Sequence, residues 1–255
     1  MNTQELKDNW LKEEKREFKG WDFTYLNDRW EQENLPWDYR KIVTGNLSPT
    51  KKLLDMGTGG GEFLLSLNHP CHLTSVTEKW EPNAVLCKKK LEPSGICVKQ
   101  IFKEGELPFD DDSFDIIINR HESYNVNAVR RKLKKDGLFI TQQVGGKNNN
   151  NLSERILKNY KPQEFNFNLS HELMLFTDEG FEVIYSNEYY PYLRFFDIGA
   201  LVYWAGIIKW EFPGFSVNNC FEQLLELESE KQKNGYIESR QHRFIMVLKN
   251  KKGYL

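Results

Sequence analysis

The sequence predicts an α/β fold in which a mostly parallel sheet carries helices on both faces. From Lys52 onward, short apolar runs bounded by Gly, Pro and Asp alternate with helical patterns. Strand and helix in regular alternation are typical of doubly wound parallel sheets. The chain has 255 residues, 39% of them hydrophobic and 28% charged, which is enough for one large domain or two small ones.

Each element follows from its local pattern. Strands are expected where apolar runs end in a polar residue or a turn, at 53–56, 73–77, 96–99, 114–119, 138–142, 181–185 and 243–248. Helices are expected at 62–67, 82–91, 126–134 and 169–178. Pro82 suits the first turn of its helix, and Gly180 suits the end of the last one.

Four segments are expected along the chain: an N-terminal helical cap (1–50), a ligand-binding core (51–190), a helical insertion that covers a substrate (191–240), and a last strand with a tail (241–255). Insertions this long in a compact sheet usually have a function. The Gly- and Asn-rich run at 145–151 reads as a lid or linker without chemistry of its own.

Composition excludes several classes of protein. The 35 Lys and Arg against 37 Asp and Glu give a net charge of -2, so a nucleic-acid partner is disfavoured. Four cysteines without CxxC spacing or clustered histidines predict free thiols and no metal site. The charged N-terminus lacks a signal peptide, and the apolar run 198–208 is too short to span a bilayer. We therefore expect a cytoplasmic protein with no membrane partner; its oligomeric state is left open.

The strongest motif is the acidic, glycine-rich turn Asp55-Met56-Gly57-Thr58-Gly59-Gly60-Gly61, which joins an expected strand to an expected helix. Glycines let a ligand approach the backbone, and a helix N-terminus offers unpaired N–H groups. A Walker phosphate loop would need GK[ST], and a dinucleotide fingerprint would need glycine where Glu62 stands. The turn alone therefore leaves the ligand open.

A second acidic residue narrows the choice of ligand. Glu78 ends the next strand and lies 23 residues after Asp55 (78 minus 55), close to the spacing at which a carboxylate reaches a ribose diol. Alone, Glu78 would be read as a solvated residue at the start of a loop. The pair favours a ligand that contains adenosine.

These residues, followed by Leu107-Pro108-Phe109 and Asp111-Asp112-Ser113-Phe114-Asp115, resemble the class I S-adenosylmethionine-dependent methyltransferases over about residues 50–190. The resemblance implies a Rossmann-like, doubly wound sheet of seven strands, mostly parallel with the last strand antiparallel. It also implies S-adenosylmethionine as cofactor and S-adenosylhomocysteine as product.

The resemblance further implies which residues hold the cofactor. The methionine part would lie over the turn, Glu78 would bind the ribose, and Lys79 and Trp80 would lie near the adenine. Glu104 is our candidate for the acid that accepts a hydrogen bond from the adenine amino group. If the alignment with the family shifts by one residue, Lys103 takes this position, and only backbone atoms can bind the base. The full expected set is Asp55, Met56, Gly57, Thr58, Gly59, Gly61, Glu78, Lys79, Trp80, Lys103, Glu104, Asn119 and Arg120.

The methyl acceptor is expected at the end of strand 114–119, which continues as Asn119-Arg120-His121-Glu122. Of these side chains only the His121 ring titrates near neutral pH without help, so it is the candidate general base. The alternative is a loop histidine bonded to Glu122 or to a backbone carbonyl.

The acceptor itself is expected to be a small molecule. The Asp/Asn-Pro-Pro-Tyr/Phe motif of many enzymes that methylate base amino groups is missing. Methylation of cytosine at carbon 5 needs a Pro-Cys nucleophile, but Pro70-Cys71 follows the first helix, far from the acceptor strand. The alternatives are an rRNA or tRNA methyltransferase and a cofactor-binding module without catalysis. The basic run 130–135 is read as a solvated helix face.

Substrate contacts are expected from Trp37, Tyr39, Glu122, Tyr192 and Arg194. Trp37 and Tyr39 would act as a lid over the cofactor, or Trp37 would be a plug in the core. Arg194 would clamp a carboxylate or phosphate, or form a structural ion pair. The aromatic residues of the late insertion are equally compatible with a pocket and with a core.

Overall fold

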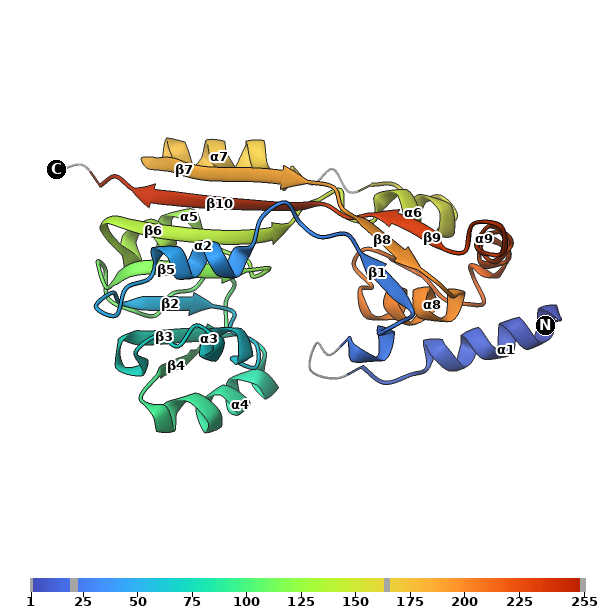
Figure 1. Cartoon of the computed structure of the whole chain (residues 1–255), viewed down its shortest axis with the longest axis horizontal. Helices are drawn as coiled ribbons and strands as arrows, with labels where there is room; N and C mark the ends of the chain where they lie inside the picture. The colour runs from blue at the N-terminus through green and yellow to red at the C-terminus, as the bar shows by residue number, and fades with distance from the viewer. Residues whose placement is uncertain (1, 19–22, 163–165, 253–255) are drawn as a thin grey trace. The chain divides into compact units, whose positions relative to one another are not determined.

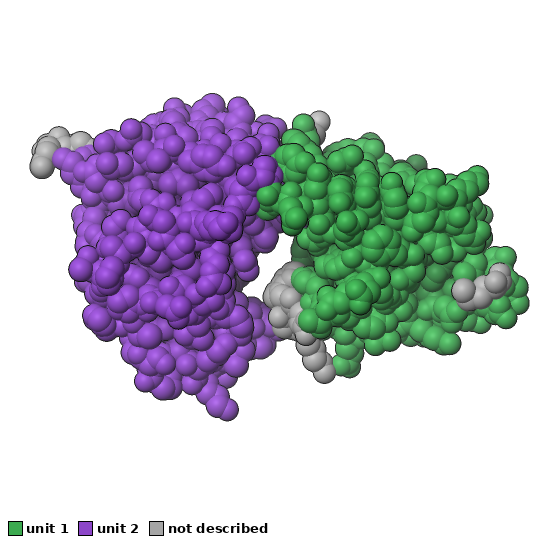
Figure 2. All heavy atoms as spheres, in the orientation of Figure 1, with its two compact units in different colours: residues 1–35, 146–165, 189–242 green, residues 36–145, 166–188, 243–255 purple. Residues whose placement is uncertain are grey.

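A seven-stranded sheet organises one part of the chain, and a three-stranded sheet organises another (Figure 1). The computed structural model describes residues 2–18, 23–162 and 166–252. It divides the chain into two units, each assembled from three segments (Figure 2). Unit 1 comprises 1–35, 146–165 and 189–242, and unit 2 comprises 36–145, 166–188 and 243–255.

Unit 2 contains the seven-stranded sheet, in the order β4-β3-β2-β5-β6-β10-β7. Its strands are β2 (Leu53–Met56), β3 (Thr74–Glu78), β4 (Cys97–Gln100), β5 (Phe114–Arg120), β6 (Leu133–Val144), β7 (Phe181–Tyr189) and β10 (Arg243–Asn250). From β4 to β6 all neighbours are parallel, whereas β10 runs antiparallel to β6. The predicted fold class is confirmed: a doubly wound, mostly parallel sheet of seven strands with an antiparallel last strand.

The helices of unit 2 pack on this sheet. They are α2 (Tyr39–Asn46), α3 (Glu62–Ser66), α4 (Glu81–Leu91), α5 (Val126–Lys132) and α7 (Leu169–Asp178), with short 3-10 turns η2 (Cys71–Leu73) and η3 (Glu92–Ser94). Helices α5 and α7 cover one face, where Val129 and Phe176 join Ile117 and Phe139 in a buried cluster. Asn125 starts α5 by accepting the Ala128 N–H at 2.9 Å, which satisfies a donor that the first turn leaves unpaired.

Unit 1 is built around an antiparallel sheet of β1 (Trp30–Gln32), β8 (Tyr192–Phe195) and β9 (Ile237–Arg240). Its other elements are α1 (Thr3–Glu14), η1 (Thr24–Leu26), α6 (Asn150–Ile156), α8 (Ile198–Ile207) and α9 (Phe221–Asn234). The insertion at 191–240 was expected to be helical, so its two strands are a correction. Strands of three or four residues are too short to show the period-2 pattern that predicts them.

The aromatic residues of the insertion form the core of unit 1. Phe195, Tyr203, Trp204 and Phe212 are all buried in one cluster. Trp30 packs on Trp204 with ring centroids 5.1 Å apart. Of the two readings left open by the sequence, core rather than pocket holds for these four side chains.

Two segments cross the expected domain boundaries. Residues 36–50, expected in the N-terminal cap, belong to unit 2, whereas 146–165 belong to unit 1. The Asn run is not a loose linker: Asn148 and Asn149 are buried and donate to the two Glu211 carboxylate oxygens at 2.7 and 2.6 Å. The side-chain amides thus build structure where composition suggested a polar loop.

The basic helix is shorter than predicted. It ends at Lys132, because Leu133 already pairs with Phe114 as the first residue of β6. Lys132 is 8% exposed and its ammonium lies 2.7 Å from Asp111, so this residue does not belong to a solvated face. In the described part of the chain, no helix combines the length and the apolar character that crossing a membrane requires.

Candidate functional site

The glycine-rich turn lies where β2 ends at the carboxyl edge of the sheet of unit 2. Gly57, Gly59 and Gly61 have φ values of 65°, 61° and 78°, in the left-handed region that favours glycine. The N–H groups of Gly57 and Thr58 both donate to the Thr77 carbonyl, at 3.0 and 3.1 Å. These bonds tie the turn to the end of the neighbouring strand β3.

Glu78 clamps the same turn. Its Oε2 accepts the Gly59 N–H at 2.8 Å, and its Oε1 accepts the Trp80 N–H at 2.9 Å. The residue is 6% exposed. The sequence assigned Glu78 to a ligand alone, whereas the structure also gives it a part in the fold. Each carboxylate oxygen can accept a further hydrogen bond, so ligand hydroxyls can still bind it.

Asp55 is the most perturbed acid of the site. Burial raises its pKa from the ordinary 3.8 to about 7; a hydrogen bond from Thr58 and the charge of Arg120 oppose the rise, and the negative charge of Glu78 adds to it. The side chain is 5% exposed. A carboxyl group with this pKa exchanges its proton near neutral pH.

The turn has polar, open surface available for a ligand. The Thr58 hydroxyl is buried beside the Asp55 carboxyl group. A Cβ built on Gly59 would meet nothing within 4 Å. A backbone that a ligand can approach, next to a hydroxyl group and two acids, fits the adenosyl cofactor that the motif implies.

The space over Gly57 is already filled. A Cβ built there would lie 2.7 Å from the Cβ, Cγ and Oε2 atoms of Glu122. Glu122 therefore extends from the end of β5 across the start of the turn. Burial and the charge of Glu78 raise the pKa of the Glu122 carboxyl.

The Phe63 ring packs against both the Tyr39 ring and the Arg120 guanidinium. The rings of Tyr39 and Phe63 lie 5.4 Å apart, and the Arg120 guanidinium lies 4.9 Å from the Phe63 centroid. The Tyr39 hydroxyl donates to the Asn119 carbonyl at 3.1 Å, and burial raises its pKa well above 10. Tyr39 is 6% exposed, which places it in the core of unit 2.

The side chains of Asn119 and Met56 point into the sheet. Asn119 is fully buried, and its Oδ1 accepts from Gln143 at 2.6 Å and from Thr141 at 3.2 Å. Its Nδ2 faces the Met56 sulfur at 3.9 Å. Met56 is 2% exposed, so neither of these two expected cofactor residues presents a surface to a ligand in this structure.

His121 is linked to Trp37 through Gln142. The Trp37 indole N–H donates to Gln142 Oε1 at 2.8 Å, and Gln142 Nε2 lies 3.3 Å from His121 Nε2. His121 keeps an exposed surface, yet the protein packed around its ring and the positive charges of Arg243 and Arg120 lower its pKa below 6.5. Trp37 itself is 8% exposed and so sits in the core of unit 2.

The residues expected near the adenine follow the ends of two neighbouring strands, β3 and β4. Lys79 pairs with Glu104, Nζ to Oε1 at 2.8 Å, which brings together the two segments that the adenine assignment needs. Trp80 is half exposed. The Lys103 N–H faces Glu106 Oε2 at 3.3 Å, and Lys103 is exposed.

Tyr192 and Arg194 belong to the small sheet of unit 1. Arg194 Nε donates to Glu238 at 2.9 Å, and its guanidinium lies 3.9 Å from the Tyr192 ring centroid. The Tyr192 hydroxyl donates to Glu31 at 3.2 Å. Arg194 therefore has the structural ion pair that was the alternative to a substrate clamp.

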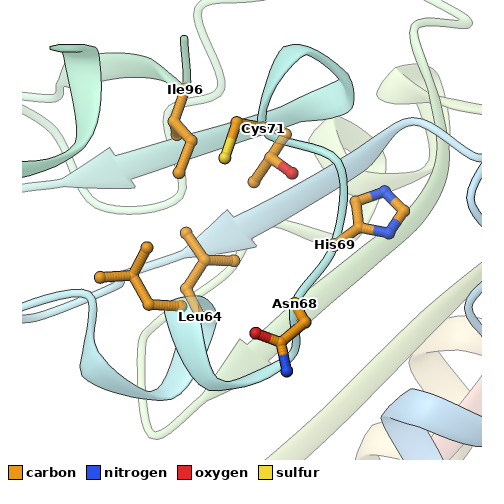
Figure 3. A pocket seen from close by; sticks show the side chains of 7 residues that line it. Leu64, Asn68, His69, Cys71 and Ile96 are labelled. Carbon is orange, nitrogen blue, oxygen red and sulfur yellow. The ribbon is translucent and has the colours of Figure 1, made fainter. Parts of the chain in front are cut away.

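A cavity of about 280 Å³ lies elsewhere in unit 2 (Figure 3). It is lined by Leu64, Leu65, Asn68, His69, Cys71, Thr74 and Ile96. Thr74 opens β3, so the cavity lies at the opposite end of that strand from Glu78. It contains none of the expected site residues and does not mark the cofactor site.

Sequence reasoning missed two side chains of this region, Phe63 and Gln142. Phe63 follows the glycine turn, and an aromatic residue in the first turn of a helix does not by itself indicate a ligand site. Gln142 did leave one: together with Gln143 it ends the apolar run 138–140, at the same sheet edge as His121.

Comparisons with known proteins agree with this geometry. Residues 54–141 match the model of a family described as a methyltransferase domain. In structure, the chain is similar to BH2331 of Bacillus halodurans, named as a candidate methyltransferase (TM-score 0.55, 17% identity, covering 84% of this chain and 99% of that one). YcgJ of Bacillus subtilis has the same TM-score of 0.55 at 16% identity, with the same 84% and 99% coverage.

The fold by itself does not fix the reaction. The [4+2]-cyclase SpnF is also similar, with a TM-score of 0.50 and 14% identity over 84% of this chain and 80% of that one. A search of curated proteins gives no match.

Proposed function

We propose that this chain, which carries a class I methyltransferase domain and uses S-adenosylmethionine, transfers the methyl group to a small-molecule acceptor by in-line displacement. The observation that carries the proposal is the joint geometry of β2, β3 and β5. These strands are parallel neighbours, so the glycine turn, Glu78 and the His121–Glu122 segment meet at one sheet edge. Open α/β sheets bind ligands at this edge.

In this proposal the turn and its clamp hold the cofactor. The backbone at Gly59 lies against the methionine part, whereas Gly57 and Gly61, which were expected there too, face Glu122 and Leu91. Glu78 accepts from the ribose hydroxyls, and Trp80 covers the adenine. When bound, the cofactor supplies a methyl group on a positively charged sulfur. Displacement of such a good leaving group needs mainly positioning and exclusion of water.

The charges around the turn support a cationic ligand. Asp55, Glu78 and Glu122 carry carboxyl groups whose fields act on one another, opposed by Arg120 and Lys79. A phosphate-bearing dinucleotide would add negative charge to this group of acids, whereas a sulfonium is attracted to it.

The state of the basic residues supports a small acceptor over RNA. Lys132 and Lys134 pair with Asp111 and Asp115, at 2.7 and 2.9 Å. Binding to a nucleic-acid backbone relies on Lys and Arg side chains that neutralise its phosphates. Within the basic run 130–135, these two lysines are therefore already neutralised by acids of the chain itself.

Calorimetry and a transfer assay test the proposal. S-adenosylmethionine and S-adenosylhomocysteine should bind, and NADH and ATP should not. Labelled methyl groups should then move to a component of a small-metabolite mixture and not to tRNA or rRNA, and Glu78→Gln should reduce both signals. Binding without transfer to any acceptor would indicate a cofactor-binding module, and transfer to RNA would indicate the alternative enzyme.

A further inference from the structure

Three side chains from separate segments form a continuous chain of hydrogen bonds in unit 2. Trp37 comes from the segment before α2, Gln142 from β6 and His121 from the residue after β5. Trp37 Nε1 lies 2.8 Å from Gln142 Oε1, and Gln142 Nε2 lies 3.3 Å from His121 Nε2. Trp37 and Gln142 are each 8% exposed.

The chemistry of the indole sets the direction of this chain. An indole N–H only donates, so the group that it meets on Gln142 is the amide oxygen. The amide nitrogen, which only donates, then faces the histidine ring. His121 Nε2 must accept this bond, and a neutral imidazole that accepts at Nε2 carries its proton on Nδ1.

The backbone holds the ring in the same place. The His121 N–H donates to the Gln142 carbonyl at 2.9 Å. His121 also has a φ of 64°, a left-handed conformation that is strained in residues other than glycine. Gln142 thus contacts His121 through both its backbone and its side chain.

We propose that Trp37 and Gln142 hold His121 as the neutral Nδ1–H tautomer, so that His121 presents a hydrogen-bond donor to the methyl acceptor and does not take its proton. The proposal rests on the proposed function, in which His121 lies beside the acceptor. It changes the part expected of His121, from general base to a residue that orients the substrate.

The charged groups around His121 favour the same state. Arg120, its neighbour on β5, and Arg243, at the start of β10, both place positive charge near the ring and oppose an imidazolium. Gln142, which contacts the ring from β6, and Trp37, which contacts Gln142 from the segment before α2, carry no charge. A donor N–H in the positive field of these two arginines suits an acceptor molecule that carries a carboxylate or another anionic oxygen.

Histidine tautomers can be observed directly by long-range proton–nitrogen NMR on the full chain with labelled histidine. The chain has five histidines, and His121→Gln identifies the signal of interest. We expect His121 to show the Nδ1–H pattern from pH 6 to 8 without titrating. An Nε2–H pattern, or a midpoint near 6.5, would overturn the proposal.

Two variants act on the chain of hydrogen bonds in opposite ways. Trp37→Phe keeps an aromatic ring but removes the donor, and we expect a mixture of both tautomers. Gln142→Glu offers acceptors to both neighbours, and we expect the proton to move to Nε2 and the pKa of His121 to rise. Tyr39→Phe, which removes a neighbouring hydroxyl bond outside the chain, should leave the His121 spectrum unchanged. Unchanged spectra in both Trp37→Phe and Gln142→Glu would also overturn the proposal.

These spectra need no substrate, so they separate this inference from the proposed function. If the protein shows the Nδ1–H pattern but binds no S-adenosylmethionine, the proposed function is refuted and the tautomer assignment is still supported. Once an acceptor is known, kcat/KM should show no ionisation from His121, whereas Gln142→Glu should introduce one. An ionisation in the wild-type profile that His121→Gln abolishes would count against the inference.

Discussion

The Glu122 side chain rests on Gly57: a Cβ added to this glycine would lie 2.7 Å from three Glu122 atoms. The contact joins the end of β5 to the turn after β2. It means that the first glycine of the turn is required by the protein itself, whereas Gly59, with open space above it, is available to a ligand.

Alanine substitutions should separate these two requirements. Gly57→Ala must adopt a left-handed φ, at a cost of about 1–2 kcal/mol, and must also displace Glu122, so it should lower the free energy of unfolding measured in urea. Gly59→Ala has the same backbone cost without a clash, so it should be less destabilising but should abolish cofactor binding.

Gly45→Ala is the matched control. Gly45 lies in helix α2 with nothing within 4 Å of a built Cβ, so alanine should stabilise the protein by about 0.5–1 kcal/mol. Equal destabilisation by Gly57→Ala and Gly59→Ala would contradict the role given to Glu122.

Glu78→Gln should separate ligand binding from folding. The amide keeps one oxygen for the backbone N–H groups of the turn but loses the charge, and loss of charge-assisted bonds to a ligand costs about 1.5–3 kcal/mol, or roughly 10- to 150-fold in Kd. Glu78→Ala should also destabilise the apo protein, because the N–H groups of Gly59 and Trp80 would lose their acceptor. Calorimetric titration and urea unfolding measure the two effects, and wild-type affinity in Glu78→Gln would remove the ribose assignment.

Asp55 should make the stability of the apo protein depend on pH. Its carboxyl ionises at 3.8 in the unfolded chain and at about 7 when folded, so the folded protein holds a proton that the unfolded chain has released. The contribution of Asp55 is therefore present in full below pH 3.8 and is lost as the pH rises to about 7, by up to about 4 kcal/mol at 1.36 kcal/mol per pKa unit. Asp55→Asn should gain stability over wild type between pH 5 and 8; a difference that stays constant with pH would show that the carboxyl is not perturbed.

Trp37→Ala should test whether the N-terminal aromatic residues are core or lid. Trp37 is 8% exposed and hydrogen-bonded, so its truncation should cost about 3–5 kcal/mol. Trp80→Ala, at a half-exposed tryptophan, should change the stability of the apo protein much less. If hydrogen exchange of residues 35–40 is fast in the apo protein and slows on addition of cofactor, the lid is correct after all.

Sequence patterns were sufficient for the central sheet and for the glycine turn. Apolar runs predict β2, β3 and β5, and the positions of Asp55 and Glu78 at strand ends predict that they share an edge, because parallel neighbours end together. The resemblance to class I methyltransferases, drawn from the same residues, is confirmed by the domain match.

Contacts between distant segments could not be predicted in this way. Gln142 reaches Trp37 across 105 residues, and that contact depends on the register of β6 and on where residues 36–38 fold. Asn149 lies 90 residues from its partner Ser239, so nothing in the local Asn run distinguishes a buried network from a solvated loop. In both cases the burial of the polar side chain depends on a hydrogen-bond partner that lies far away in the sequence.

The position of β10 has a consequence for how the sheet is completed. This strand comes after all the others in the chain, yet it lies between β6 and β7 (Figure 1). Until residues 243–250 are in place, β6 and β7 each have an open edge, and the slot between them exposes backbone groups that invite pairing with other chains. A protein cut before Arg243 should therefore aggregate. A synthetic peptide of residues 243–252, added separately, should pair with β6 and β7 and keep the truncated protein folded and monodisperse.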